Sequence, residues 1–322
     1  MGVAGHSSGD LLADRRFEYA RAYAEAGEHA AAADLCAQAL EIVPDWLPAL
    51  IAAADALVAD GRPDEALPWL RRAAALDADG LFGAGLKLAA LGAVAMPDHP
   101  PAAYVRGLFD DYADRFETAL VDDLAYRAPW LIAAALDAVR PGANFAAGMD
   151  LGCGTGLMAK VLAGRLGRFI GCDLSAEMTA RAAPRYAEVL TGDVLDSLAR
   201  APGPYDLVTA ADVFVYVGAL DAVFAATRRA LAPHGLFAFS VEEAPAGADL
   251  VLRDSLRYAH GEAYVRRLAA EHGFNVLALD RATLRLDRRT PISGLVVLLG
   301  ATHQENLVAH NQPGQLVRSE KC

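Results

Sequence analysis

Two kinds of hydrophobic pattern divide the chain. Residues 11–95 are rich in alanine and place apolar side chains at helical spacing, which predicts a series of helices. From residue 145 onward, short unbroken apolar runs alternate with helical stretches, which predicts a parallel sheet whose strands are covered on both faces. The predicted strands are 145–149, 169–172, 187–190, 205–210, 235–240, 274–279 and 294–299.

The stretches between these runs predict the helices of the second part. Residues 157–166 follow the first predicted strand, and Ser175 is placed to cap a further helix. A helix is also predicted over 123–139, where Pro141 and Gly142 end it, and another over 262–272.

A period of 34 residues runs through the N-terminal part. Gly27 and Gly61 are separated by this period, and three alanine pairs share it: Ala20 and Ala54, Ala32 and Ala66, Ala39 and Ala73. With Tyr23 and Pro44, the pattern resembles tetratricopeptide repeats, although Ala78 replaces the second closing proline and a third repeat is visible only over 81–91. Because so few repeats are marginal alone, we expect the last helix to dock on the next domain. A helical spacer and a peptide-binding groove both stay open.

The composition between and after these parts sets the predicted boundaries. Three prolines lie in the six residues 96–101, so 96–103 is predicted to be a linker between the repeats at 11–95 and a domain at 104–300. Residues 301–322 are polar and without periodicity, and are expected to be a disordered tail or an expression remnant.

A glycine-rich turn follows the first predicted strand. Residues 150–156 read Asp-Leu-Gly-Cys-Gly-Thr-Gly, and glycine lets the backbone turn tightly and approach a ligand. A dinucleotide-binding turn requires G-x-G-x-x-G/A, but Leu157 occupies its last position. A phosphate-binding P-loop requires a lysine followed by serine or threonine, which is missing here. The remaining pattern resembles the first motif of class I S-adenosylmethionine-dependent methyltransferases.

This resemblance extends over most of the chain. It is similar to the bacterial methyltransferases that carry an N-terminal tetratricopeptide segment. It implies an α/β, Rossmann-like sheet that is parallel except for an antiparallel last strand, with the final hairpin turning at 287–291. It also implies S-adenosylmethionine as cofactor. Asp150 would lie near the methionine ammonium group, Asp173 at the ribose hydroxyls and Asp193 at the adenine amino group.

The resemblance implies a wider set of cofactor-binding residues. Residues 104–116 resemble a segment that covers the cofactor, in which Phe109 is expected to pack in the core. The predicted set is Tyr112, Phe116, Asp150, Leu151, Gly152, Cys153, Gly154, Gly156, Asp173, Leu174, Met178, Gly192, Asp193, Val194, Ala211 and Asp212.

The methyl-acceptor side is less well marked. Residues 211–214 replace the Asn-Pro-Pro-Tyr or Asp-Pro-Pro-Tyr segment typical of adenine or glutamine methylation. His260 is a candidate base because imidazole titrates near neutrality, and Asp212 is another; structural roles stay open for both. Tyr216, Arg257 and Tyr258 are predicted to contact the substrate.

Charge and cysteine content narrow the function classes. The net charge is −12, and residues 1–100 carry 15 acidic and 7 basic residues, so nucleic-acid binding is not expected. Four cysteines form no C-x-x-C pair, so no structural metal is expected. The sequence shows no apolar run long enough to span a bilayer, and its first ten residues do not resemble a signal peptide. A cytoplasmic protein without membrane contact is therefore expected.

The predicted function is methyl transfer from S-adenosylmethionine to a small molecule or a protein side chain. The alternative is a non-catalytic scaffold that binds the cofactor and recruits a protein partner through its helical repeats. A nicotinamide oxidoreductase is disfavoured by Leu157 and by the antiparallel end of the sheet.

Overall fold

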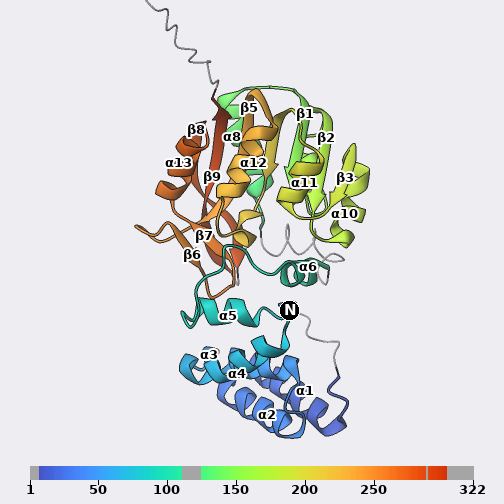
Figure 1. The fold of residues 1–322 in the computed structure, drawn as a ribbon, viewed down its shortest axis with the longest axis vertical. Helices are drawn as coiled ribbons and strands as arrows, with labels where there is room; N and C mark the ends of the chain where they lie inside the picture. The colour runs from blue at the N-terminus through green and yellow to red at the C-terminus, as the bar shows by residue number, and fades with distance from the viewer. Residues whose placement is uncertain (1–6, 111–124, 288, 303–322) are drawn as a thin grey trace, which may run out of the picture.

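The computed structural model describes residues 7–110, 125–287 and 289–302. The first elements are helices that pack consecutively on one another at one end of the molecule (Figure 1). They are α1 (Leu11–Glu25), α2 (His29–Ile42), α3 (Leu47–Ala59), α4 (Pro63–Leu76) and α5 (Ala84–Ala90). The predicted N-terminal helical segment is confirmed. Its similarity to tetratricopeptide repeats stays a prediction.

The turns after α1 and α3 share one geometry. In the first, the Glu28 N–H donates to the Tyr23 carbonyl at 2.9 Å; in the second, Arg62 donates to Leu57 at the same distance. Gly27 and Gly61 adopt φ of +82° and +77°, the left-handed conformation that ends a helix in this way. The 34-residue period of these glycines therefore marks equivalent helix ends.

A mixed sheet forms the second part. Parallel strands have the order β3-β2-β1-β4-β5, β9 pairs antiparallel with β5, and β8 pairs with β9. A hairpin of β6 and β7 joins the end of β5. The strands are β1 (Phe145–Leu151), β2 (Leu166–Asp173), β3 (Glu188–Thr191), β4 (Tyr205–Ala210), β5 (Leu231–Glu243), β6 (Leu250–Leu252), β7 (Tyr258–His260), β8 (Phe274–Asp287) and β9 (Thr290–Ala301). The predicted fold class is confirmed.

Helices cover both faces of this sheet (Figure 1). One face packs against α8 (Ala128–Val139) and α9 (Leu157–Val161), and the other against α11 (Val194–Arg200), α12 (Asp221–Ala230) and α13 (Glu262–Glu271). The helix predicted over 157–166 ends at Val161. Gly164, with φ of +79°, turns the chain into β2, which starts at Leu166.

Helix α6 (Ala102–Asp110) connects the two parts. Tyr104 and Val105 on α6 pack with Leu86 of α5 and with Leu252 and Tyr258 of the β6–β7 hairpin. The predicted linker is bound as well: the Gly218 N–H donates to the Asp98 carbonyl at 2.8 Å. The helical segment therefore docks at the carboxyl ends of the strands, although the domain boundaries themselves stay predictions.

Candidate functional site

The glycine turn leaves β1 at its carboxyl end. Gly152 and Gly154 have φ of +62° and +53°, which residues with a Cβ rarely adopt. A Cβ on Gly152 would lie 2.5 Å from a methyl group of Val213. The Cys153 N–H donates to the Cys172 carbonyl at 2.8 Å, so the turn stays attached to β2. Position 152 therefore requires glycine, because any other residue would be strained at this φ and its Cβ would clash with Val213.

Asp150 is the last acidic side chain before this turn, and it is fully buried. Its Oδ1 accepts a hydrogen bond from Thr209 Oγ1 at 2.6 Å, and its Oδ2 accepts one from the Tyr186 hydroxyl at 2.5 Å. Burial raises the pKa of the Asp150 carboxyl to about 7, against the lowering effect of these two hydrogen bonds.

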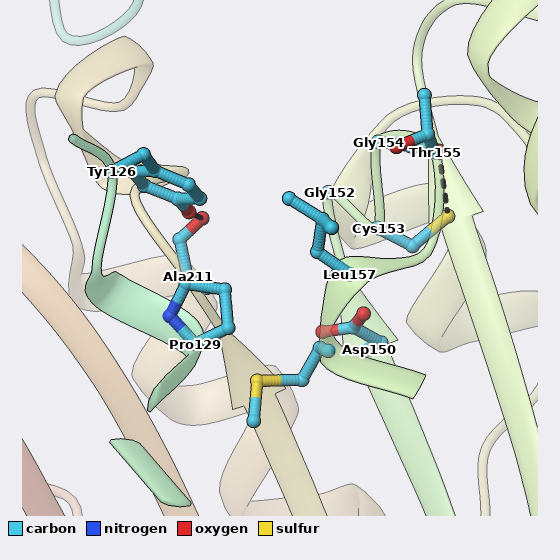
Figure 2. A pocket seen from close by; sticks show the side chains of 10 residues that line it. Tyr126, Pro129, Asp150, Gly152, Cys153, Gly154, Thr155, Leu157 and Ala211 are labelled. Carbon is cyan, nitrogen blue, oxygen red and sulfur yellow. Dashed lines mark hydrogen bonds between the residues drawn. The ribbon is translucent and has the colours of Figure 1, made fainter. Parts of the chain in front are cut away.

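A pocket opens beside the turn and encloses about 340 Å³ of atom-free space, part of it open to solvent. Figure 2 shows the glycine turn and Asp150 on one side and Tyr126 with Pro129 on the other. The lining residues are Tyr126, Pro129, Asp150, Gly152, Cys153, Gly154, Thr155, Leu157, Met158 and Ala211. Apolar walls with one carboxylate suit a small ligand that has one cationic end.

Asp173 ends β2 and reaches the same turn. Its Oδ2 accepts from the Gly154 N–H and its Oδ1 from the Ser175 N–H, both at 2.9 Å. Burial raises the pKa of its carboxyl. A carboxylate offers about four lone-pair sites, so two hydrogen bonds leave acceptor capacity for hydroxyl groups of a ligand.

Most of the other predicted cofactor residues do not line this pocket, and their role stays a prediction. Leu151 and Met178 are buried, and Gly156 caps α9 in a left-handed conformation. Gly192 donates to the Asp173 carbonyl at 2.9 Å, and the Asp193 carboxylate caps α11, which begins at Val194. Leu174 packs on the cluster that contains α6. Tyr112 and Phe116 lie outside the described residues.

A buried group of charges lies at the carboxyl ends of β4 and β5. Arg285 of β8 places Nη1 2.6 Å from both carboxylate oxygens of Asp212, and its Nη2 pairs with Glu242. Asp212 has φ of +59° and its N–H donates to Ser240 Oγ at 2.9 Å. Burial raises the pKa of Asp212, although Arg285 opposes this shift. Asp212 follows Ala211, which lines the pocket, but Asp212 is not itself one of the lining residues.

Two predicted acceptor-side residues are buried elsewhere. Tyr258 is fully buried, and its hydroxyl donates to the Pro97 carbonyl at 2.8 Å, so this position gives no support to its predicted substrate contact, which stays a prediction. His260 is fully buried in β7, with Nε2 at 3.1 and 2.9 Å from the carbonyl oxygens of Val217 and Gly218. Burial lowers its pKa to about 4. A neutral imidazole that donates to backbone does not fit the predicted general base.

Tyr216 and Arg257, the other two predicted substrate contacts, lie together. The Arg257 Nε–H is 3.4 Å from the Tyr216 hydroxyl, and Nη1 is 3.3 Å from Asp287. The Tyr216 ring meets Phe109 of α6 edge to face, with centroids 5.3 Å apart. Phe109 therefore packs between the two parts.

Several site residues were not predicted. Thr155 lies inside the glycine turn, and Leu157 and Met158 follow it. The glycine motif could therefore have predicted that these three residues line the pocket. Glu242 follows directly on the apolar run of β5, which is the signal that could have found it, whereas Arg285 lies among other polar residues of β8 and has no such signal. Nothing local to Tyr126 indicates its contact with the Ala211 carbonyl at 3.1 Å, because 85 residues separate the two.

Residues 149–235 match the family described as Methyltransferase domain, and this range contains the glycine turn, Asp173 and Asp212. No curated protein matches the chain. Among solved structures, it is similar to the N-methyltransferase NodS of Bradyrhizobium japonicum in complex with S-adenosyl-L-homocysteine, with 16% identity, coverage of 62% of this chain and 98% of that chain, and a TM-score of 0.48. It is also similar to the magnesium protoporphyrin IX methyltransferase ChlM of Synechocystis with bound S-adenosylmethionine. The identity is 17%, the match covers 65% of this chain and 99% of that chain, and the TM-score is 0.47.

Proposed function

We propose that this chain, which carries a methyltransferase domain over residues 149–235, transfers the methyl group of S-adenosylmethionine to a small molecule or a protein side chain. One observation carries the proposal: the glycine turn, Asp150 and Asp173 meet at the carboxyl ends of β1 and β2. Open sheets of this kind bind nucleotides and nucleosides at that edge.

The residues present fit the cofactor. Gly152 lines the pocket and has no side chain to keep a ligand away from its backbone. Asp173 keeps acceptor capacity for ribose hydroxyls, and Asp150 presents a carboxylate to the cationic amino-acid part. When bound, the cofactor supplies an electrophilic methyl group on a sulfonium ion.

On the acceptor side, we assign the proton-accepting role to Asp212. The pKa of its carboxyl is raised by burial, which makes it a stronger base, while Arg285 fixes both oxygens. An acceptor O–H or N–H would lose its proton to Asp212 as the acceptor atom forms its bond to the methyl carbon, and the bond from that carbon to sulfur would break to leave neutral S-adenosylhomocysteine. Such proton transfer contributes about 10²–10⁴-fold to rates, and the remainder comes from alignment in a dry site. Tyr216 and Arg257 are the proposed substrate contacts.

Release of S-adenosylhomocysteine tests this function. The full chain is incubated with S-adenosylmethionine and, in turn, with pooled small metabolites or a protein lysate, and the released product is quantified by mass spectrometry. Acceptor-dependent release that falls in Asp212→Asn supports the enzyme. Cofactor binding without release from any pool would instead favour the scaffold that recruits a protein through its helical segment.

A further inference from the structure

Tyr186 does not line the pocket, but it contacts Asp150, which does, and packs against β2 and the glycine turn. It precedes β3, and its hydroxyl donates to Asp150 Oδ2 at 2.5 Å. Its ring packs on Phe169 of β2, with centroids 5.0 Å apart, and lies under Gly156, where a Cβ would be 3.1 Å from the ring. The preceding residue, Arg185, donates from Nη1 to the Thr155 carbonyl at 2.7 Å. One short segment therefore contacts both the acid and the glycine turn.

The charge environment of Asp150 differs from that of Asp212 and Glu242, and resembles that of Asp173, for which no cationic partner is described either. Asp212 and Glu242 are each paired with Arg285. The described partners of Asp150 are two hydroxyl groups, on Tyr186 and Thr209, and neither is cationic. Electrostatic interactions couple the pKa of Asp150 to the pKa values of nearby titratable groups. These groups are Asp173, Tyr126, Cys153, Cys172 and Tyr186.

A buried carboxylate without a paired cation is costly unless a ligand supplies the positive charge. Its two hydrogen bonds favour the ionised form, because a hydroxyl donates more strongly to a carboxylate than to a carboxylic acid. Burial favours the protonated form, so the pKa of Asp150 lies near 7. The Tyr186 hydroxyl therefore contributes to a balance between two nearly equal protonation states.

We infer that Tyr186 is a positioning residue of the pocket that binds the methyl donor: its hydroxyl orients Asp150 and stabilises the ionised form against the protonated one, so that binding of the cationic donor is linked to release of a proton from Asp150. The inference rests on the proposed function, because it requires a donor with an ammonium group. When the donor binds, the proton leaves Asp150 for solvent and the donor ammonium replaces its charge.

Isothermal titration calorimetry of S-adenosylhomocysteine with the full chain from pH 5.5 to 8.5 tests the inference. The affinity of the unaltered chain should rise with pH through about 7. In Tyr186→Phe the ring packing is kept, and the midpoint should move up by about one pH unit. At pH 7 the carboxylate would then be ionised about a tenth of the time instead of about half, which weakens binding about fivefold. The two proteins should converge above pH 8.

Three further variants separate positioning from general damage. Tyr205→Phe is the matched control, because it removes a buried tyrosine hydroxyl that donates to the Ala201 carbonyl at 2.8 Å away from the pocket; its profile should be unchanged. Thr209→Val removes the second hydrogen bond to Asp150 and should shift the midpoint in the same direction. Asp150→Asn should abolish the step near pH 7.

The outcomes are distinct. An unshifted midpoint in Tyr186→Phe, or a step that persists in Asp150→Asn, overturns the inference while the proposed function stands. Failure of the unaltered chain to bind S-adenosylhomocysteine at any pH contradicts the proposed function instead. If Tyr186→Phe does not fold, an unshifted midpoint in Thr209→Val overturns the inference.

Discussion

Arg285 links the ends of two neighbouring parallel strands through its guanidinium group. The side chain is almost fully buried, and it reaches Asp212 after β4 and Glu242 in β5. Arg253 pairs with the other oxygen of Glu242 at 3.1 Å. A planar fork with several donors suits this bridging position, where a lysine would offer one point charge. The network fixes the carboxylate to which we assign proton transfer.

Loss of Arg285 should therefore be costly. Arg285→Met leaves Asp212 without its paired cation and Glu242 with Arg253 alone, which we expect to lower the free energy of unfolding by about 3–5 kcal/mol in urea denaturation. Adding Glu242→Gln removes one of those charges and should recover part of the loss. Arg281→Met is the control, because Arg281 pairs with Glu243 and Glu262 at an exposed position and should matter little. Equal stability of the two arginine variants would contradict a structural role for the buried network.

Asp173 is expected to serve both binding and structure. Asp173→Ala loses the proposed ribose hydrogen bonds, each worth about 1.5–3 kcal/mol to a charged acceptor, so cofactor affinity should fall at least about tenfold. It also releases the N–H groups of Gly154 and Ser175, so the melting temperature should fall as well. The cofactor affinity and melting temperature of Asp173→Asn should lie between those of the unaltered chain and Asp173→Ala. Calorimetry and thermal melting on the same proteins check this; an affinity unchanged after correction for the folded fraction would remove Asp173 from the site.

His260 should make the fold sensitive to acid. Its pKa is lowered to about 4 in the folded chain, below the ordinary 6.5, so the unfolded chain binds the extra proton between these values. Stability from this group is therefore complete above about pH 6.5 and is lost as the pH falls toward 4, at no more than about 1.4 kcal/mol per pH unit. His260→Gln keeps a neutral donor and should flatten this slope in urea denaturation, whereas His99→Gln, at an exposed position, should not. Parallel slopes in all three proteins would exclude the contribution of His260.

At the scale of elements, the sequence predicted those strands and turns whose conformation depends on their own residues. The unbroken apolar runs marked β1, β4 and the core of β5, because a strand covered on both faces needs no alternation. The glycine turn was found because its backbone conformation depends on its own residues. The position of His260 before α13 was also predicted, but not that it lies in β7, whose pairing with β5 and β6 buries it. The contacts of Tyr186 and Arg285 join distant segments, and no local pattern encodes them.

The docking of the linker can be tested by one substitution. A Cβ on Gly218 would lie 2.7 Å from both the Asp98 carbonyl oxygen and the Tyr258 ring. Gly218→Ala should therefore displace residues 97–101 from the sheet domain, lower the melting temperature and increase proteolysis within that segment. Gly85→Ala is the matched control, since its Cβ meets nothing within 4 Å inside helix α5 and alanine favours helix. A melting temperature as high in Gly218→Ala as in the control would show that the linker does not need this close contact.

At the scale of the whole molecule, the helical segment and the proposed acceptor side lie at the same end of the sheet (Figure 1). Packing between α5, α6 and the β6–β7 hairpin fixes this arrangement. A protein recruited by the helical segment would therefore be held near Tyr216 and Arg257, which supports a substrate or a regulator as the proposed partner.

In the described residues, no helix is long and apolar enough to cross a bilayer.

The central claim is that the pocket beside the glycine turn binds a methyl donor, and calorimetry on the full chain tests it most directly. S-adenosylmethionine, S-adenosylhomocysteine and NAD are titrated separately into the protein at pH 8, where Asp150 is mostly ionised. We expect saturable binding of the first two ligands, lost or weakened at least about tenfold in Asp173→Ala, and no binding of NAD. Binding of NAD without binding of either S-adenosyl ligand would contradict the account.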